Sequence, residues 1–344
     1  QYTGGTTGIP KGAMLSHANL TINVQQIIAW SNILELQVER VMGILPFFHV
    51  FAMTTVLNFS IKTGSMMILM PKFELDQAIK LIRQHKPTIL PGVPTLYTAL
   101  LNHKAIKREH LASLKLCISG GAALPQEVRR RFEEFSGCKL VEGYGLSETS
   151  PVATVNPITG LEKAASIGQP VPRTYISIRS LEDPAKQMPK GESGEICIKG
   201  PQLMQGYWNN SSATKAVMQG GYFRTGDVGY TDEFGFTYII DRIKDMINCS
   251  GYKVYPRRIE DAIYDHDAVA EVTVIGIPDD YRGEAPKAFI KLKEGCTATA
   301  DEMLAHLKPK LSKIEMPEEI EFRDELPKTL VGKLSKKELR EQMD

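Results

Sequence analysis

Apolar residues between positions 20 and 144 occur in short runs that alternate with segments of helical periodicity. Short apolar runs are typical of buried strands, whereas apolar residues three or four positions apart indicate helices. The runs predict strands over residues 41–45, 65–70, 114–119 and 139–144. The periodic segments predict helices over residues 75–85, 94–102 and 125–135. This alternation indicates an α/β domain of layered sheet and helices with a largely parallel sheet.

The pattern changes twice along the rest of the chain. From about residue 165 to residue 240, strand-like runs are separated by glycine and proline turns, which predicts a β-rich subdomain of the large domain. These runs cover residues 175–179, 195–199 and 236–240. Beyond them the pattern predicts helices over 256–265 and 300–311 and a strand over 269–277. We therefore expect a large domain over residues 1–240 and a small α+β domain over residues 241–344.

Composition places the chain among globular proteins, since 42% of its 344 residues are hydrophobic and 24% are charged. The formal net charge of +1 gives no indication of nucleic acid as a partner. Five cysteines are scattered along the chain without a Cys-x-x-Cys pair. This usage predicts neither a disulfide framework nor a zinc site, and it fits a reducing cytosol.

Residues 41–61 carry no charge and are numerous enough to cross a bilayer in principle. Pro46, His49, Asn58 and several hydroxyl residues interrupt the stretch, however. A strand, a turn and a buried helix account for it better, so we predict no transmembrane segment.

Residues 2–12 have the sequence Tyr-Thr-Gly-Gly-Thr-Thr-Gly-Ile-Pro-Lys-Gly and form a candidate anion-binding loop. Glycines can adopt positive φ, so successive N–H groups can converge on an anion, while the threonine hydroxyls and Lys11 add further donors. A flexible surface turn is the alternative. The loop is not a Walker motif, because Lys11 precedes Gly12 and not a serine or threonine. A ligand loop at residue 2 leaves no room for the strand before it, so we expect the chain to be part of a longer protein.

Two further small-residue segments, residues 119–124 and 143–148, follow predicted strands. Ligands of parallel sheets bind at the carboxyl ends of strands, so we expect both segments at one rim. Gly143-Tyr144-Gly145 lacks the third glycine of a dinucleotide fingerprint, which leaves that motif without support.

The opening loop resembles the Thr-Gly-Gly-Thr-Thr-Gly-x-Pro-Lys-Gly signature of the adenylate-forming enzymes, the acyl-CoA synthetase superfamily. Four further segments resemble the family's motifs in the family's order: Glu-Gly-Tyr-Gly-Leu-Ser-Glu at 142–148, Gly-Tyr-Phe-Arg-Thr-Gly-Asp at 221–227, Asp-Arg-Ile-Lys-Asp-Met-Ile at 241–247 and Pro-Lys-Thr-Leu-Val-Gly-Lys-Leu at 327–334. The resemblance spans essentially the whole chain and is closest to bacterial long-chain fatty acid–CoA ligases. It departs at Ser147, where the family has threonine, but the hydroxyl is kept.

The resemblance implies a nucleotide site. The opening loop would hold the departing pyrophosphate, Gly121 and Ala122 would flank the adenine, and Asp227 would accept hydrogen bonds from both ribose hydroxyls. The implied ATP- and AMP-binding residues are Thr3, Gly4, Gly5, Thr6, Thr7, Lys11, Gly121, Ala122, Glu142, Gly143, Tyr144, Gly145, Ser147, Asp227 and Arg242. Thr6 and Glu148 would bind Mg²⁺, for which a carboxylate is a suitable hard ligand.

The resemblance also implies catalytic roles for Lys333, His49 and Glu148. Lys333 corresponds to the adenylation lysine, whose ammonium offsets the repulsion between the substrate carboxylate and the phosphates. His49 lies in a segment that resembles the aromatic-histidine stretch beside the acyl carboxylate, and Glu148 acts around ATP and Mg²⁺. A solvated basic helix is the alternative for Lys333, and a core position is the alternative for His49.

In the family, the position of Asp241 is the hinge about which a mobile small domain turns. The loop with Ser250, Gly251 and Tyr252 resembles the loop that lines the pantetheine path, which implies CoA binding there. For Arg242, a surface ion pair is the alternative.

The implied activity is that of an ATP-dependent fatty acid–CoA ligase, which forms acyl-adenylate and pyrophosphate and then acyl-CoA and AMP. Its implied cofactors are ATP, Mg²⁺ and coenzyme A, and fatty acid and CoA are the small-molecule substrates. Three alternatives stay open: an aryl-CoA ligase, a synthetase that loads a carrier protein, and an inactive chain that lacks the family's N-terminal portion. We expect a cytoplasmic protein, and a lipid substrate is compatible with peripheral association at the inner face of the membrane.

Overall fold

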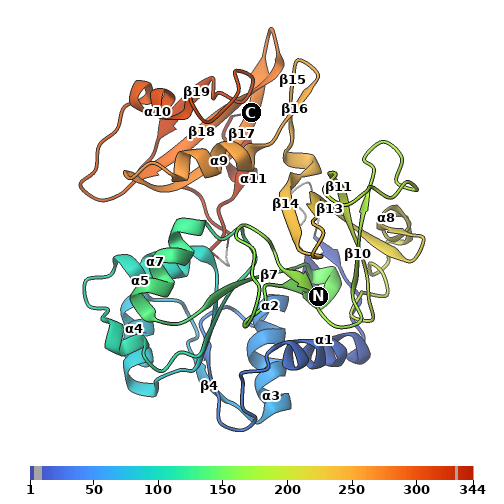
Figure 1. Cartoon of the computed structure of the whole chain (residues 1–344), viewed down its shortest axis with the longest axis vertical. Helices are drawn as coiled ribbons and strands as arrows, with labels where there is room; N and C mark the ends of the chain where they lie inside the picture. Colours follow the sequence, from blue (N-terminus) through green and yellow to red (C-terminus); the bar gives the residue numbers. More distant parts are fainter. Residues whose placement is uncertain (4–9, 330–331, 344) are drawn as a thin grey trace. The chain divides into compact units, whose positions relative to one another are not determined.

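The structure is a computed structural model that describes residues 1–3, 10–329 and 332–343 (Figure 1). By its internal contacts the chain divides into two compact units. Unit 1 consists of residues 1–225 and 230–238, and unit 2 consists of residues 226–229 and 239–344.

A seven-stranded sheet forms the centre of unit 1. Its strands are β3 (Arg40–Gly43), β4 (Met66–Leu69), β5 (Ile89–Gly92), β6 (Leu116–Ser119), β7 (Leu140–Gly145), β8 (Val152–Val155) and β9 (Gln169–Pro170). The order across the sheet is β4-β3-β5-β6-β7-β8-β9. The strands from β4 to β7 are parallel, and β8 and β9 add antiparallel pairs. This sheet confirms the predicted α/β fold class.

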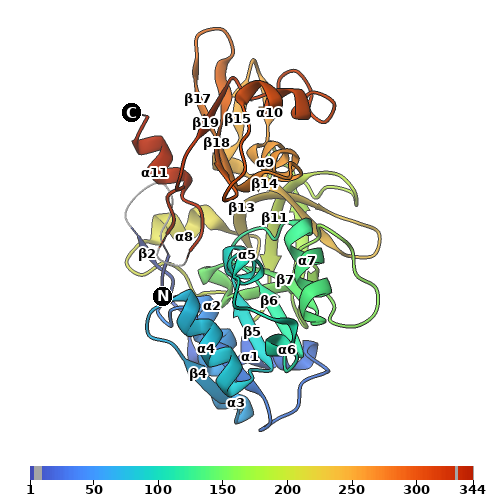
Figure 2. The ribbon, with the colours of Figure 1, turned by 90° about the vertical axis from the view of Figure 1, so that its left-hand side faces the viewer.

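Helices cover both faces of this sheet. They are α1 (His17–Trp30), α2 (Val50–Ala52), α3 (Phe59–Thr63), α4 (Leu75–His85), α5 (Pro94–Asn102), α6 (Arg108–Leu111) and α7 (Gln126–Ser136), and a π-helical segment, Met53–Asn58, joins α2 to α3. Figures 1 and 2 show α4, α5 and α7 on one side of the sheet and α1 and α3 on the other. Fully buried side chains from both layers form one core, such as Leu90 and Leu140 from the sheet and Ile82, Leu100 and Phe132 from the helices.

The predicted strands and helices of this region are confirmed, with ends that differ by two residues at most. The uncharged stretch 41–61 consists of the end of β3, a turn, and the helical run from α2 to α3. Within the described residues, no helix is long and apolar enough to cross a membrane.

Helix α1 and strand β5 escaped prediction, for different physical reasons. The buried face of α1 is largely polar, because Asn23 exchanges hydrogen bonds with the backbone of Val152 (2.8 and 3.0 Å) and Gln26 donates to the carbonyl of Pro172 (2.6 Å). The apolar periodicity of this segment is therefore weak, and the pattern does not predict the helix. Strand β5 is a four-residue run that ends in Pro91 and Gly92, which are residues depleted in strands.

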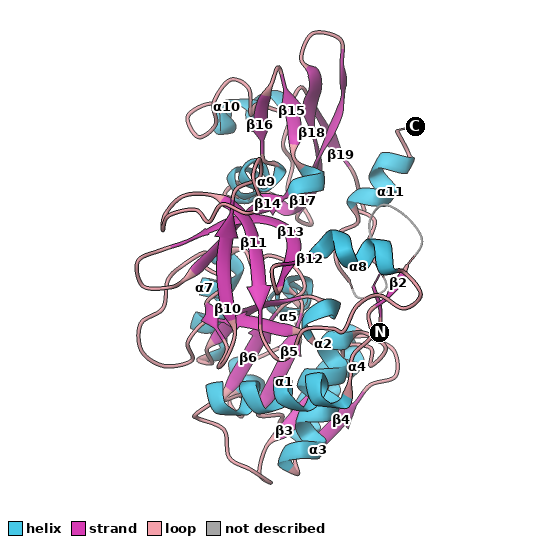
Figure 3. Ribbon diagram, turned by 90° about the vertical axis from the view of Figure 1, so that its right-hand side faces the viewer, coloured by secondary structure: helices cyan, strands magenta, loops and turns pink. Residues whose placement is uncertain are grey.

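A second, antiparallel sheet confirms the predicted β-rich subdomain. Its strands are β10 (Tyr175–Arg179), β11 (Gly194–Lys199), β12 (Met218–Gln219), β13 (Tyr222–Thr231) and β14 (Thr237–Arg242). Their order is β10-β11-β13-β12, with β14 paired to β13. Figure 3 shows these long strands together with helix α8 (Ser211–Val217).

Unit 2 is an α+β module, as predicted. Its strands are β15 (Ile247–Cys249), β16 (Tyr252–Val254), β17 (Val269–Asp279), β18 (Gly283–Leu292) and β19 (Glu319–Phe322), and its helices are α9 (Pro256–Tyr264), α10 (Ala300–Leu307) and α11 (Lys336–Glu341). Ile259 and Ile263 of α9 pack on Val274 of β17 in the core. The prediction of a helix up to residue 311 was wrong, because α10 ends at Leu307, two residues before Pro309. Proline has no N–H, so Pro309 cannot donate to the carbonyl of Ala305, and the helical hydrogen bonds are interrupted there.

Gly145→Ala tests the close approach of two backbone segments at the end of β7. A Cβ on Gly145 would lie 1.9 Å from the carbonyl oxygen of Pro151, and a backbone atom cannot move aside cheaply. We expect this variant to lower the free energy of unfolding by about 2–3 kcal/mol, measured by urea denaturation. Gly143→Ala in the same strand is the matched control, because the nearest atoms to its Cβ would lie 3.7 Å away. Equal losses in the two variants would contradict this account.

Candidate functional site

The loops after β6 and β7 lie at the same edge of the parallel sheet. In the parallel register Ser119 of β6 is opposite Glu142 of β7, and Gly92 of β5 is opposite Ser119. The chain therefore leaves all three strands at one edge, and the predicted common rim is confirmed.

The predicted adenine-flanking residues, Gly121 and Ala122, are exposed in the loop after β6. Gly121 has a φ of +80°, which glycine adopts readily. The loop is tied to the neighbouring strand because the N–H of Leu124 donates to Oε1 of buried Glu142 at 3.2 Å. Glu142 thus supports the loop through its carboxylate, and the exposed small residues leave space for a flat base.

The segment after β7 carries Ser147 and Glu148 on a 3₁₀ turn, Ser147–Thr149. Gly143, Tyr144 and Gly145 are the last residues of β7 and pair with β8. Two hydrogen bonds of 2.8 Å hold the following Ser150: Thr54 donates to its carbonyl, and its own hydroxyl donates to the carbonyl of Gln202. The turn is therefore fixed from two sides.

Glu148 is a buried carboxylate with one hydrogen-bonded oxygen. Its Oε1 accepts from the hydroxyl of Tyr207 at 2.7 Å, and the part of the chain that the structure describes offers no partner to Oε2. Burial and the adjacent carboxylate raise the pKa of Tyr207 well above its usual value, so the phenol remains a donor. No sequence motif drew attention to Tyr207. The available signal was a hydroxyl-bearing aromatic residue directly after a glycine, Gly206.

The ends of the opening loop form a short hairpin of β1 (Tyr2–Thr3) and β2 (Lys11–Gly12), with Thr3 opposite Lys11. The predicted phosphate-binding residues Gly4, Gly5, Thr6 and Thr7 lie outside the described residues. The Lys11 ammonium lies 5.1 Å from the centroid of the Tyr207 ring. Lys11 and Glu148, which are far apart in the sequence, therefore meet the same aromatic side chain.

His49 follows β3 and begins α2. Its Nδ1 accepts a hydrogen bond from the N–H of Phe51 at 3.2 Å, which fixes the orientation of the half-buried ring. The ring of Phe51 packs on Gly120 of the loop after β6, where an added Cβ would lie 3.2 Å from it. The aromatic-histidine segment thus lies at the same edge as the predicted adenine loop, and the capping bond gives His49 a structural role as well.

In unit 2, the predicted ribose ligand Asp227 is buried in β13 and forms an ion pair with Arg242 at 3.1 Å. Arg242 is the last residue of β14, and its side chain is 47% exposed. The pair holds the Asp227 carboxylate beside the Arg242 guanidinium.

The predicted hinge residue, Asp241, connects β14 to α9. One carboxylate oxygen accepts from the N–H of Arg242 at 2.7 Å, and the other accepts from the N–H of Arg257, in the first turn of α9, at 2.8 Å. Burial raises the pKa of Asp241. The two bonds anchor the residues after Asp241 to the body of unit 2.

Lys333 lies in a narrow hairpin that precedes α11. The N–H of Thr329 donates to the carbonyl of Lys333 at 2.8 Å, and the N–H of Ser335 donates to the carbonyl of Pro327 at 2.9 Å. The alternative of a solvated basic helix is therefore wrong for Lys333, because α11 begins only at Lys336. Burial, with a smaller contribution from the Arg242 guanidinium, lowers the pKa of Lys333 to about 8.

The predicted CoA-binding residues form the exposed tip of the β15–β16 hairpin. Ser250 (φ +52°) and Gly251 (φ +84°) make a two-residue turn, and Cys249 pairs with Tyr252 across it. Positive φ at both turn positions is typical of type I′ hairpins. The N–H of Ser250 donates to the carbonyl of Arg282 at 2.7 Å, which joins this tip to the neighbouring hairpin.

No cluster of three or more His, Cys, Asp or Glu side chains that could hold a metal ion occurs among residues 1–3, 10–329 and 332–343. Glu148 differs from such a cluster, because it is a single buried hard carboxylate whose Oε2 has no partner among the described residues. That arrangement fits Mg²⁺ held mainly by phosphate oxygens and water, as is usual in nucleotide sites.

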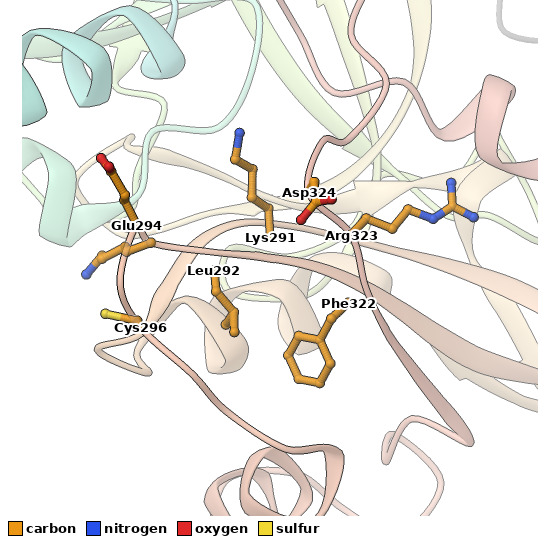
Figure 4. A pocket seen from close by; sticks show the side chains of 8 residues that line it. Lys291, Leu292, Glu294, Cys296, Phe322, Arg323 and Asp324 are labelled. Atoms are coloured by element: carbon orange, nitrogen blue, oxygen red, sulfur yellow. The ribbon is translucent and has the colours of Figure 1, made fainter.

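A hollow of about 580 Å³ opens in unit 2 beyond the ends of β18 and β19 (Figure 4). It is lined by Lys291, Leu292, Lys293, Glu294, Cys296, Phe322, Arg323 and Asp324. Of the predicted site residues that the structure describes, none lines it. Lys291 and Arg323 are already paired, with Glu325 at 2.7 Å and Glu321 at 2.6 Å. The hollow therefore contributes nothing to the predicted chemistry.

Comparison with known families and proteins agrees with this geometry. Residues 1–208 match the AMP-binding enzyme family, and residues 258–333 match the AMP-binding enzyme C-terminal domain. The chain is 50% identical over 342 residues to a long-chain-fatty-acid–CoA ligase of Bacillus subtilis (strain 168). This alignment covers 99% of the chain and 61% of that protein, so the chain spans about three fifths of the relative's length. It is 36% identical to a feruloyl-CoA synthase of Amycolatopsis sp., over 98% of the chain and 68% of that protein. The ATP-bound crystal structure of MatB from Rhodopseudomonas palustris superposes with a TM-score of 0.93 at 34% identity, over 99% of this chain and 67% of that one.

Asp241→Ala tests the anchoring role of the predicted hinge residue. Because the N–H of Arg257 loses its acceptor, we expect the free energy of unfolding to fall by about 1 kcal/mol and hydrogen exchange at that amide to accelerate. Asp241→Asn is the matched control, since its amide oxygen still accepts one bond and the effect should be smaller. Unchanged exchange at Arg257 in the alanine variant would contradict the assignment.

Proposed function

Because the chain belongs to the family of AMP-binding enzymes, we propose that it carries the adenylating site of an ATP-dependent fatty acid–CoA ligase. Identity at half of the positions with a long-chain-fatty-acid–CoA ligase supports the substrate class. The observation that carries the proposal is the convergence of Lys11 and Glu148 on Tyr207, in the unit whose parallel sheet bears the adenine loop.

In the first half-reaction, a carboxylate oxygen of the acid attacks the α-phosphorus of ATP, and pyrophosphate leaves. Lys11 and the hydroxyls and N–H groups of the opening loop bind the phosphates that depart. Glu148 and Thr6 would hold Mg²⁺, which would neutralise charge on the phosphate oxygens. Asp227 accepts the ribose hydroxyls, and the ion pair with Arg242 keeps its carboxylate in place.

Lys333 supplies a positive charge to the reacting centre of this step. The attacking carboxylate and the triphosphate are both anions, and charge accumulates on the α-phosphate oxygens in the transition state. An ammonium in contact with both groups stabilises that state more than the separated reactants. The segment Pro-Lys-Thr-x-x-Gly-Lys, which ends at Lys333, supports this role.

In the second half-reaction, the thiol of CoA attacks the acyl carbon, and AMP leaves with the oxygen that came from the acid. We expect unit 2 to turn about Asp241 for this step, so that Lys333 leaves the reacting centre and the turn at Gly251 borders the thiol's path. Peripheral membrane association through the lipid substrate stays a prediction.

The preferred acid substrate is determined with a panel of short- to long-chain fatty acids and hydroxycinnamic acids. Aromatic acids belong in the panel because a feruloyl-CoA synthase is among the relatives. Acyl-AMP and pyrophosphate are measured first, and CoA or a phosphopantetheinylated carrier protein is then offered. We expect acyl-CoA from long-chain acids. A preference for aromatic acids would favour an aryl-CoA ligase, and no adenylate from any acid would contradict the proposed activity.

Lys333→Ala should separate the two half-reactions. We expect acyl-AMP formation to fall by roughly three orders of magnitude or more, because the transition state loses its positive charge. Thioester formation from preformed acyl-AMP and CoA should stay close to the wild-type rate. Both steps are measured in single turnovers, and equal losses in the two would refute the assigned role.

The lowered pKa of Lys333 also predicts the alkaline limb of the adenylation rate. Below about pH 8 the side chain is an ammonium, and above it the neutral amine predominates, so acyl-AMP formation should fall as the pH rises through about 8. Lys333→Arg keeps its charge to a pH above roughly 12, so its limb should move to higher pH even if the plateau rate is lower. An alkaline limb that is identical in both proteins would exclude Lys333 as its origin.

A further inference from the structure

Tyr207 lies between two groups of unit 1 that the proposed reaction needs. Its hydroxyl donates to Oε1 of Glu148 at 2.7 Å, and its ring faces the Lys11 ammonium, 5.1 Å from the ring centroid. An ammonium over an aromatic face is attracted to the ring electrons. One side chain therefore contacts both the proposed phosphate-binding cation and the proposed metal-binding carboxylate.

The backbone of Tyr207 is held against the strand that carries Lys11. Tyr207 forms an antiparallel bridge with Ala13, and the N–H of Trp208 donates to the carbonyl of Gly12 at 2.7 Å. The N–H of Tyr207 donates to Oγ1 of Thr214 at 2.8 Å. These bonds fix the backbone of Tyr207 beside the strand that carries Lys11.

Glu148 is joined to the same segment through its own backbone. Its carbonyl accepts from the N–H of Met204 at 2.8 Å, three residues before Tyr207. A buried carboxylate is costly unless donors satisfy it, and the Tyr207 hydroxyl is the donor that the described structure provides to the side chain. Since it binds one oxygen, the rotation of the carboxylate is restricted and the other oxygen is presented in a defined direction.

We propose that Tyr207 is a positioning residue for the divalent cation of the nucleotide, which acts by fixing the Glu148 carboxylate through its hydroxyl and the Lys11 ammonium through its ring. The proposal rests on the adenylating function proposed above. Hydrogen bonds that orient a metal-ligating side chain contribute to metal affinity, and their removal typically costs 10- to 100-fold. A purely structural phenol would instead affect stability and leave the metal dependence unchanged.

Tyr207→Phe tests the proposal, because it keeps the ring and its contact with Lys11 while removing the hydroxyl. Two readouts are used: the Mg²⁺ concentration that gives half-maximal acyl-AMP formation in single turnovers, and Mn²⁺ binding in the presence of a non-hydrolysable ATP analogue, followed by electron paramagnetic resonance. We expect the half-saturating Mg²⁺ concentration and the Mn²⁺ dissociation constant to rise by roughly tenfold or more. The adenylation rate at saturating Mg²⁺ should fall by only about threefold, because the reacting groups are unchanged.

Tyr97→Phe is the matched control. Tyr97 is also fully buried in unit 1, and its hydroxyl donates to the carbonyls of Leu90 and Ile118 at 2.8 and 3.0 Å. Removing the Tyr97 hydroxyl should lower the free energy of unfolding without changing either metal readout. If both variants shift the metal dependence equally, or if Tyr207→Phe leaves it unchanged, the proposed role of Tyr207 is overturned.

The two readouts separate this proposal from the proposed function. If the wild-type protein forms acyl-AMP but Tyr207→Phe shows the wild-type Mg²⁺ dependence, only the role of Tyr207 fails. If the wild-type protein forms no acyl-AMP, the adenylating function fails, and Mn²⁺ binding with the ATP analogue still decides the role of Tyr207. Absence of Mn²⁺ binding in the wild-type protein would overturn the role of Tyr207, and the acyl-AMP assay would still decide the adenylating function.

Discussion

The parallel pairing of β6 with β7 is the constraint on which the site of unit 1 depends. With Ser119 opposite Glu142, the loops after both strands emerge together at one edge. The hydrogen bond from Leu124 to Glu142 then ties one loop to the strand of the other. A shift of the register by one residue would turn Glu142 to the other face of the sheet and remove this bond, because side chains alternate along a strand. The predicted adenine loop and the turn with Glu148 therefore depend on backbone pairing before any ligand is bound.

Backbone hydrogen bonds also hold part of the β-rich subdomain at this edge. The segment from Met204 to Trp208 bonds both to the backbone of Glu148 and to the opening hairpin. It thereby delivers the Tyr207 hydroxyl to a carboxylate 59 residues earlier in the chain. In unit 2 the same principle applies at Asp241, whose two oxygens join the end of β14 to the first turn of α9. In both units, buried carboxylates therefore help to hold backbone segments together.

The fold class and the parallel strands β3, β4, β6 and β7 were predictable from the sequence, because the apolar runs of these strands are buried in one core. Prediction from the sequence failed where burial is polar, as at Asn23 and Gln26 of α1, since hydrogen bonds there replace apolar contacts and leave no periodic signal. Motif order identified Glu148 and Lys333, whose roles stay proposals. It did not identify Tyr207, because the distance between its hydroxyl and Glu148 is set by tertiary structure and not by spacing in the chain.

The fate of the acid's oxygen tests the central claim most directly. If the carboxylate attacks the α-phosphorus and the thiol then displaces AMP, a fatty acid labelled with ¹⁸O in both carboxyl oxygens transfers one label to AMP and keeps the other in the thioester. Mass spectrometry of the products of a reaction with ATP, Mg²⁺ and CoA measures this distribution. We expect one ¹⁸O in AMP and none in pyrophosphate. Unlabelled AMP, or ADP with labelled inorganic phosphate, would contradict an adenylating site.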